Sequence, residues 1–147
     1  MKKLFFCILT TSLIIGSLPA VKVSAQRPGV ITGALSYPTD TGLPNMIVCA
    51  EAADSKSLHC TDKRVTNRRT RKVTYKLTVP AGSYYVFAIL VNGEESGEAY
   101  WGYKAYYSEF VICGLSVNCP SHEPFKITLR AGETLRGIDP GDWYVDN

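Results

Sequence analysis

The stretch from residue 72 to residue 91 restricts the fold more than any other part of this chain. Residues 72–79, KVTYKLTV, alternate polar with apolar side chains, and a period of two predicts a strand with one buried face. Pro80-Ala81-Gly82 ends that strand, because proline donates no backbone hydrogen bond and glycine accepts positive φ. Residues 83–91 are apolar on both faces and predict a central strand.

Other short runs of the same kind predict the remaining strands, and turn-forming residues separate them. These runs cover residues 30–37, 46–51, 57–61, 106–112, 125–130 and 134–138. No run of ten or more residues shows the apolar spacing of a helix. Seven or eight short strands predict an all-β fold, an antiparallel β-sandwich.

The first 25 residues have the pattern of a secretory signal peptide. Two lysines precede an apolar run, Leu4–Leu18, that is too short for an ordinary membrane span. Residues 23–25 are small or branched side chains that suit cleavage before Gln26. An uncleaved anchor is the alternative, which Pro19 and the small residues disfavour.

Removal of the leader leaves an electrically balanced chain. The sequence has 16 basic and 13 acidic residues, and three of the basic ones, at positions 2, 3 and 22, lie in the leader. Thirteen of each sign remain, so the chain as a whole attracts neither nucleic acid nor an anionic membrane. We expect one exported domain, residues 26–147, that is periplasmic or secreted and does not span the membrane.

Four cysteines remain after cleavage, and an even number in an exported chain predicts two disulfides. Four cysteines allow three pairings, and their count does not choose among them. We favour Cys49–Cys60 and Cys113–Cys119. A hairpin with its turn at Asp54-Ser55 sets residue 49 opposite residue 60, and neither spacing suits a structural zinc site.

The segment YKLTVPAGSYYVFAIL, residues 75–90, resembles the strand–Pro-Ala-Gly–strand segment of transthyretin-like (prealbumin-like) domains. These are also called carboxypeptidase regulatory-like or carbohydrate-binding-like β-sandwiches. The mature chain also resembles a group of small exported bacterial proteins of uncharacterised function that end in GIDPxDWY. Their shared pattern falls here on residues 36–38, 44, 49, 79–88, 113–122 and 131–144. The resemblance implies a fold, and a fold does not by itself imply an activity.

An aromatic-rich stretch, EAYWGYKAYYSEF, is the best candidate for a binding surface. Aromatic rings stack on sugars or on protein partners, and tyrosine and tryptophan add a polar group. Packing in the core is the alternative for the same side chains. The predicted binding residues are Tyr100, Trp101, Tyr103 and Tyr107.

A basic run, KRVTNRRTRK, occupies residues 63–72 between two predicted strands. A solvated loop is the ordinary interpretation of such a run. The alternative is a patch that faces anions of lipopolysaccharide, of peptidoglycan or of an acidic protein. The residues proposed for this patch are Arg64, Arg68, Arg69 and Arg71.

Catalysis is the minority interpretation, and we expect neither a cofactor nor a metal. No nucleophile motif such as G-x-S-x-G is present, and the cysteines are better used in disulfides. His122 follows the second disulfide loop and is the one histidine considered for a base or a metal ligand. A lone loop histidine is usually structural or solvated.

The C-terminal motif GIDPGDWY is interpreted mainly as a latch that fastens the last strand. Aspartate, proline and glycine supply turn chemistry, and two aromatics follow that can fold over the end of the core. Calcium is the alternative, but two carboxylates fall short of the six or more oxygens it needs. The latch residues are Asp139, Asp142, Trp143 and Tyr144.

The sequence therefore predicts a small exported β-sandwich that binds rather than catalyses. The leading hypothesis is contact with an envelope polysaccharide or a protein through the stretch from Tyr100 to Tyr107. The second is an inhibitor or interaction module acting through loops 113–119 or 63–72. The third is a metal-binding protein or an enzyme that uses His122.

Overall fold

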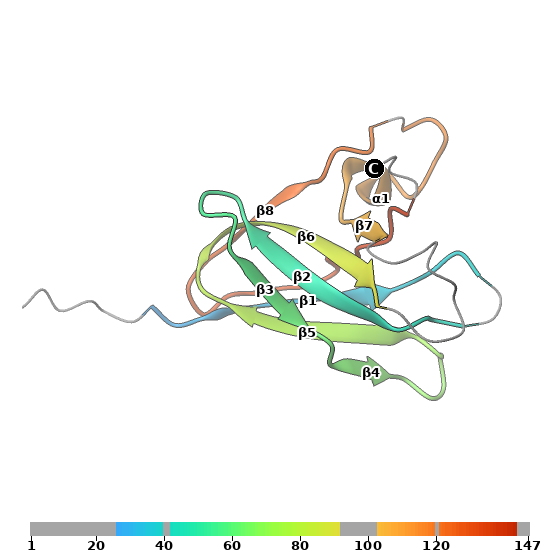
Figure 1. Ribbon diagram of the computed structural model, residues 1–147, viewed down its shortest axis with the longest axis horizontal. Coiled ribbons are helices and arrows are strands. Elements are labelled where there is room, and N and C mark those ends of the chain that lie inside the picture. The colour runs from blue at the N-terminus through green and yellow to red at the C-terminus, as the bar shows by residue number, and fades with distance from the viewer. Residues whose placement is uncertain (1–25, 40–41, 92–102, 120, 144–147) are drawn as a thin grey trace, which may run out of the picture.

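A computed structural model describes residues 26–39, 42–91, 103–119 and 121–143. The described chain is all-β, with nine strands in two sheets and one short helix (Figure 1). The all-β prediction is confirmed. The expected number of strands, seven or eight, was slightly low, because one short strand at Arg64–Thr66 was not expected, while the strand expected at 134–138 is present in shorter form. No helix among the described residues is long and apolar enough to cross a membrane.

The first sheet has the strand order β4-β5-β1-β9. Its strands are β1 (Gly29–Leu35), β4 (Arg64–Thr66), β5 (Val73–Val79) and β9 (Thr134–Leu135). β1 pairs with β5 in antiparallel fashion along its whole length. It pairs with β9 in parallel, so the expectation of a purely antiparallel fold was wrong at this edge. The chain reaches β9 by crossing from the other sheet, which sets its direction.

The second sheet contains β2 (Met46–Ala52), β3 (Leu58–Thr61), β6 (Gly82–Leu90), β7 (Lys104–Tyr106) and β8 (Lys126–Leu129). β6 is central, as its two apolar faces predict. β2 pairs with it along one side, while β8 and β7 pair with its two halves along the other.

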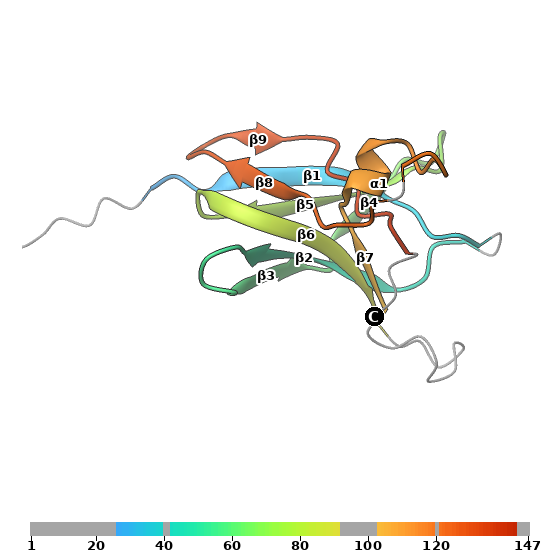
Figure 2. The ribbon, with the colours of Figure 1, turned by 90° about the horizontal axis from the view of Figure 1, so that it is seen from above.

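The two sheets enclose one apolar core, and Figure 2 shows them as two layers seen from above. Alternate residues of β5 and of β6 point into this core. The buried aromatic side chains of the core are Tyr75, Tyr84 and Trp143. The other faces of the sheets lie on the outside of the molecule, and these outer faces carry the candidate sites.

Two predictions of local structure were wrong. A strand was expected over residues 106–112, but the strand that is present, β7, ends at Tyr106, and α1 (Glu109–Ile112) follows it. The chain bends there because Ser108 is buried and donates a hydrogen bond to Asp142, far along the sequence. The basic run expected to be a loop contains β4, which pairs with β5 by a hairpin.

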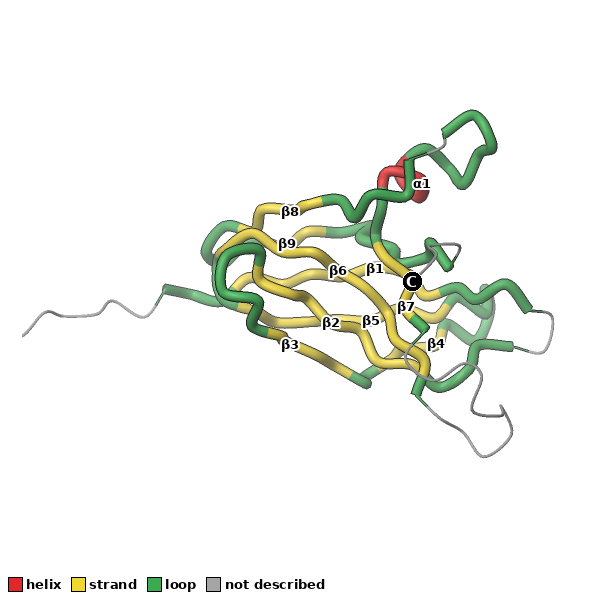
Figure 3. The backbone as a smooth tube through the Cα atoms, turned by 45° about the horizontal axis from the view of Figure 1, so that its top comes forward, coloured by secondary structure: helices red, strands yellow, loops and turns green. Residues whose placement is uncertain are grey.

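The structure contains the two favoured disulfides, Cys49–Cys60 and Cys113–Cys119. Cys49 lies directly opposite Cys60 in the β2–β3 ladder, as the hairpin register predicts. The second disulfide closes the loop that follows α1. Figure 3 shows α1 and this loop standing away from the strands at one end of the molecule.

Candidate functional site

The outer face of the second sheet carries an aromatic cluster that is separate from the core. Phe87 points outward from β6 and is nevertheless almost fully buried. The ring of Tyr106 lies 5.3 Å from it, and the ammonium of Lys104 lies 5.0 Å from its centroid. In the ladder Phe87 is paired with Cys49, one half of the first disulfide. These neighbours cover an apolar side chain that would otherwise face water, and they hold Tyr106 in place.

A hollow of about 490 Å³ opens beside this cluster. It is lined by Glu51, Lys56, Tyr85, Tyr106, Glu123 and Pro124. The ammonium of Lys56 donates to Glu51 Oε1 at 3.0 Å and lies 5.6 Å from the centre of the Tyr85 ring. The hydrogen bond to Glu51, followed by the charge of that carboxylate, raises the pKa of Lys56 above its ordinary value. The hollow therefore combines two phenol rings with two carboxylates and an ammonium.

The aromatic residues predicted from the sequence fall in three different places. Tyr100 and Trp101 lie outside the described residues. Tyr103 is exposed just before β7. Tyr107 packs against the core, and its ring contacts Phe125 edge-on at 6.0 Å. Burial, with a smaller contribution from the charge of Asp139, raises the pKa of the Tyr107 phenol.

Two tyrosines of the hollow, Tyr85 and Tyr106, were not among the predicted binding residues. Each is the chain neighbour of another tyrosine, and neighbours in a strand point to opposite faces. Tyr84 faces the core while Tyr85 faces outward. The two Tyr-Tyr pairs in the sequence therefore indicated that one tyrosine of each pair faces outward. Which one it is depends on the neighbouring strands, and the sequence alone did not show that.

A buried carboxylate joins the C-terminal segment to the region around α1. Asp142 is fully buried, and its Oδ2 accepts a hydrogen bond of 2.6 Å from Ser108 Oγ. His122 Nδ1 lies 3.0 Å from both carboxylate oxygens. The imidazole stacks against Phe110 with 4.4 Å between the ring centres, and 35% of the His122 side chain is exposed.

The order of these three groups determines their chemistry. In a nucleophilic triad the imidazole lies between the hydroxyl and the carboxylate, so that it can accept the hydroxyl proton. Here the carboxylate of Asp142 lies between Ser108 and His122, and Ser108 donates to it. This order fixes the imidazole by its Nδ1 and does not activate Ser108 as a nucleophile. The array joins three segments that are far apart in the sequence.

The first half of the predicted latch lies along β1. Asp139 Oδ1 accepts a hydrogen bond of 2.7 Å from the backbone N–H of Ala34. The carbonyl of Ile138 accepts one of 2.7 Å from the hydroxyl of Tyr75, which is buried in the core. Gly33 permits this approach, because a Cβ at that position would overlap the Ile138 carbonyl. The segment thus packs directly on the backbone of β1.

The second half of the latch reaches the chain just beyond β1. Trp143 is buried, and its Nε1 donates to the carbonyl of Ser36 at 2.9 Å. Its ring meets Tyr37 edge-on, with 5.0 Å between the ring centres. Tyr144 lies outside the described residues. Asp139 and Asp142 bind different segments, and the stabilising role of the latch stays a prediction.

The four arginines of the predicted anion patch are all exposed, and hydrogen bonds hold the guanidinium of Arg64. Arg64 donates to the carbonyl of Pro44 at 2.9 Å and to Asn45 Oδ1 at 3.1 Å. Its guanidinium therefore joins β4 to the loop before β2. Arg68, Arg69 and Arg71 lie exposed in the turn of the β4–β5 hairpin.

The loop closed by Cys113–Cys119 presents apolar side chains to solvent. Ile112, Leu115 and Val117 are all exposed, and Val117 most of all, at 94%. Leu115 holds a positive φ of 58°, which tightens the turn after α1. A short disulfide loop with exposed aliphatic groups is a second candidate surface, and it lies at the end of the molecule where α1 stands out.

In the part of the chain that the structure describes, no three His, Cys, Asp or Glu side chains are grouped so that they could hold a metal ion. Comparison of the chain with protein-family models, with curated proteins and with solved structures finds no match.

Proposed function

We propose that this protein is an exported, non-catalytic binding domain that contacts envelope glycan through the hollow on the outer face of its second sheet. The domain would be a transthyretin-like β-sandwich, periplasmic or secreted. The observation that carries the proposal is the pairing of Tyr85 and Tyr106 with Glu51, Lys56 and Glu123 around one open hollow.

This combination of groups suits a sugar. A pyranose ring has apolar faces that pack on aromatic rings, and its rim of hydroxyls needs donors and acceptors close by. The two tyrosines supply ring surface, while the two carboxylates accept and Lys56 donates. The volume of about 490 Å³ lies within the usual range for small-ligand sites, roughly 300–1,000 Å³. Two disulfides agree with an exported protein.

The experiment is a pull-down of the purified protein, with its disulfides formed, on insoluble peptidoglycan and on a panel of neutral polysaccharides. We expect retention on at least one of these glycans. Tyr106→Ala and Tyr85→Ala should each reduce the retained fraction strongly, because each removes one of the two rings on which a sugar face would pack.

Two further variants locate the site. Tyr103→Ala removes an exposed tyrosine outside the hollow, and Trp101→Ala removes the residue favoured by the sequence. Loss of retention with Tyr106→Ala but not with Tyr103→Ala or Trp101→Ala places the sugar in the hollow. The reverse result places it on the stretch at 100–103. Absence of retention on every glycan contradicts the proposal.

A second candidate function is docking of the Cys113–Cys119 loop into a protein partner. It is favoured by the exposure of Ile112, Leu115 and Val117 on a loop that the disulfide holds closed. Pre-organisation of this kind reduces the entropy lost on binding. Leu115→Gly removes the side chain and suits the positive φ at that position. If a partner is captured from an envelope extract by the native protein and equally by Leu115→Gly, this loop is not the docking surface.

A further inference from the structure

Basic side chains gather on and beside the first sheet, although the mature chain is balanced in charge. They come from β4, β5, the hairpin between them and the segment after β9. These residues are Lys63, Arg64, Arg68, Arg69, Arg71, Lys72, Lys76 and Arg136. They are eight of the 13 basic residues that follow the leader. The acidic side chains of the hollow, Glu51 and Glu123, belong to the other sheet or its flanking loops.

The outer face of the first sheet displays these cations beside threonine hydroxyls. Lys76 lies between the buried residues Tyr75 and Leu77, so it points away from the core. Thr32 of β1 is its neighbour in the ladder, and Val65 of β4 is the neighbour of Thr74. The alternation of the strands therefore puts charge and hydroxyl groups on one surface that crosses β4, β5 and β1.

Two hollows share Val65 and Lys76 of this outer face in their linings, and the first also reaches Cys60 and Thr61 of β3 at the edge of the second sheet. The first has a volume of about 560 Å³ and includes Lys63 in its lining. The second has a volume of about 410 Å³ and includes Lys72 and Arg136. Because Lys76 lines both hollows, the two lie next to each other; this pair of neighbouring hollows is called the track below, and it has Lys63 in one hollow, Arg136 in the other and Lys76 between them.

Little on this face neutralises the cations. Asp62 and Asp139 are the carboxylates that line the two hollows. Asp139 already accepts a hydrogen bond from the N–H of Ala34. Among the described residues the two ion pairs are Lys56–Glu51 and His122–Asp142, and neither involves this face.

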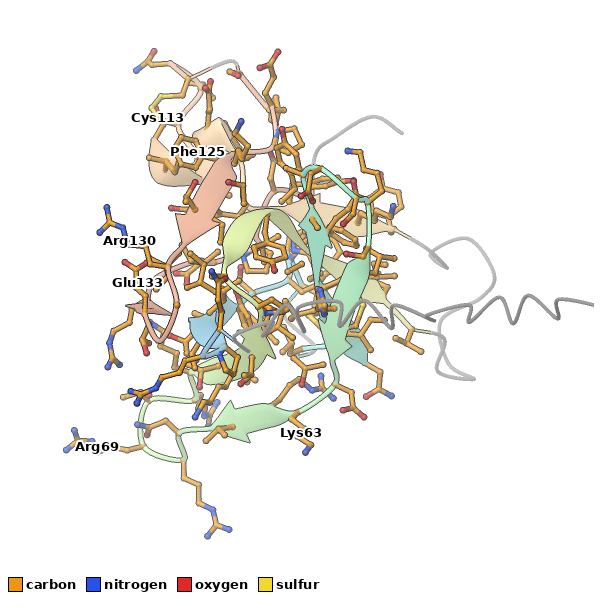
Figure 4. The ribbon with its side chains drawn as sticks, turned by 90° about the vertical axis from the view of Figure 1, so that its left-hand side faces the viewer. Lys63, Arg69, Cys113, Phe125, Arg130 and Glu133 are labelled. Carbon is orange, nitrogen blue, oxygen red and sulfur yellow. A yellow bond between two sulfur atoms is a disulfide. The ribbon has the colours of Figure 1, made fainter. Side chains whose placement is uncertain are left out.

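The hairpin next to the track holds its arginines in a defined turn. Asn67 Oδ1 accepts hydrogen bonds from the N–H groups of Arg69 and Thr70, at 3.0 and 3.1 Å. The N–H of Asn67 donates to the carbonyl of Lys72 at 2.9 Å, which closes the turn. Figure 4 shows Arg69 and Lys63 at the hairpin end of the molecule, pointing into solvent.

We propose that the outer face of the first sheet, with the β4–β5 hairpin, binds a linear anionic polysaccharide. Its carboxylate, sulfate or phosphate groups would pair with Lys63, Lys76 and Arg136. Its hydroxyls would donate to the hydroxyl oxygens of Thr32 and Thr74, whose own protons are directed to backbone carbonyls. Because the site lies on the other sheet from the Tyr85–Tyr106 hollow, the two can bind independently.

The composition of the face favours this occupant over other anions. The lining aromatic, Tyr75, is buried, and Val65 is the one large apolar side chain exposed among the described residues of the face. Single-stranded nucleic acid needs exposed rings for stacking. Stable anchoring at a membrane usually combines a basic patch with apolar groups that insert, and the centre of a protein interface is depleted in lysine.

The test measures binding of polygalacturonate oligomers, with dextran of equal length as the neutral control. We expect affinity for polygalacturonate that falls steeply with salt, as release of counterions requires, and none for dextran. Lys76→Glu with Arg136→Glu should weaken binding at low salt by about tenfold or more, and should flatten the dependence of log K on log salt.

A matched double variant controls for net charge. Lys126→Glu with Arg130→Glu makes the same change in charge at β8 and just beyond it, on the second sheet. We expect a loss of less than about threefold for this pair. Equal losses in the two double variants would show attraction to total charge and would overturn the proposal, as would failure of the native protein to bind polygalacturonate.

Two further ligands test the identity of the occupant. Tighter binding to duplex DNA or to phosphatidylglycerol vesicles than to polygalacturonate, at equal salt, would assign the face to that anion and overturn the proposal. Tyr106→Ala should leave polygalacturonate binding unchanged. This result supports an independent face and separates a failure here from a failure of the aromatic hollow.

Discussion

Gly33 faces the carbonyl of Ile138 where the C-terminal segment packs on β1. We expect Gly33→Ala to lower the free energy of unfolding by about 2 kcal/mol or more, because overpacking against backbone cannot be relieved by a side-chain rotation. Urea unfolding measures the loss. Gly82→Ala is the matched control in another strand, since its Cβ would come no closer than 3.3 Å to any atom, the nearest being the hydroxyl oxygen of Tyr84. Equal losses in the two variants would contradict the packing described for Gly33.

Because of Tyr75, we expect the free energy of unfolding to depend on pH in the alkaline range. Burial raises the pKa of its phenol well above the ordinary value, and the charge of Asp139 adds to the effect. Below about pH 10 the native and unfolded chains both keep this proton. Above that pH the unfolded chain loses it while the native chain does not. The free energy of unfolding therefore falls with pH, by up to about 1.4 kcal/mol per pH unit for this group.

The test compares unfolding of the native protein and of Tyr75→Phe between about pH 8 and pH 11. The variant should lose about 1 kcal/mol at pH 8, because the hydrogen bond to Ile138 is gone. Its stability should then decline less steeply above pH 10. Tyr103→Phe, at an exposed position, serves as the control. Parallel declines in all three proteins would refute the assignment to Tyr75.

Individual residues of the C-terminal motif could be chosen from the sequence, but their partners could not. Composition indicated turn chemistry at Asp139 and an aromatic anchor at Trp143. The contacts with Ala34 and Ser36 lie 105 and 107 residues away in the chain, and local patterns carry no information about such pairs. For the same reason, the hydrogen bond between Ser108 and Asp142 could not be predicted from the sequence.

At the scale of elements, the segment 137–143 packs on β1 and holds the chain just beyond that strand through Trp143. Trp143→Ala should lower the free energy of unfolding by about 3 kcal/mol or more, since it leaves a cavity and removes the bond to Ser36. Trp143→Phe should cost less, because it keeps most of the apolar volume. Denaturant titration distinguishes the two. A neutral result for Trp143→Ala would mean that the segment does not fasten the fold.

The β2–β3 hairpin depends on its cross-strand disulfide. Replacing Cys49 and Cys60 together by alanine should lower the free energy of unfolding by about 2–3 kcal/mol, as expected for a closed loop of this size. The measurement is urea unfolding under oxidising conditions. The ring of Phe87, which Cys49 faces across the ladder, should also become more accessible to solvent. Unchanged stability would show that hydrogen bonds of the ladder suffice.

Strands with a strict alternation or a continuous apolar run were predicted well, and irregular elements were not. β5 and β6 follow from their periodicity, and the Cys49–Cys60 pair follows from the hairpin register. β4 was missed because its side chains are all exposed, so that it has no apolar pattern. The prediction of a strand at 106–112 was wrong because the hydrogen bond from Ser108 to Asp142, a tertiary contact, outweighs the local β propensity.

At the scale of the whole molecule, balanced net charge conceals an uneven distribution. At its own isoelectric pH and low salt, a protein of residues 26–147 should be retained on a sulfonate cation exchanger through its basic face. The variant Arg68→Ser, Arg69→Ser, Arg71→Gly, at its own isoelectric pH, should elute at clearly lower salt. Glycine suits position 71, where φ is 56°. Passage of the native protein without retention would contradict the segregation of charge.

The uneven distribution of charge could not be predicted from the sequence alone. The sequence shows four arginines in one run and, for residues 26–147, equal numbers of basic and acidic residues. Lys76 and Arg136 join that run only because β5 and β9 flank β1 in one sheet. The order of strands thus brings three separate stretches of the sequence together on one basic surface. The aromatic hollow likewise consists of residues that are distant in the sequence and adjacent in the other sheet and its loops.

The parallel pairing of β1 with β9 has a consequence for the time at which the chain can fold. The first strand completes its contacts only with residues more than 100 positions further on, such as Leu135 and Asp139. A polypeptide that is made from its N-terminus delivers β1 first, β5 next and β9 much later. β1 and β5 can therefore pair while β9 is still missing, and the parallel edge of the first sheet closes only afterwards. Closure of this edge is a late, long-range step, of the kind that slows folding.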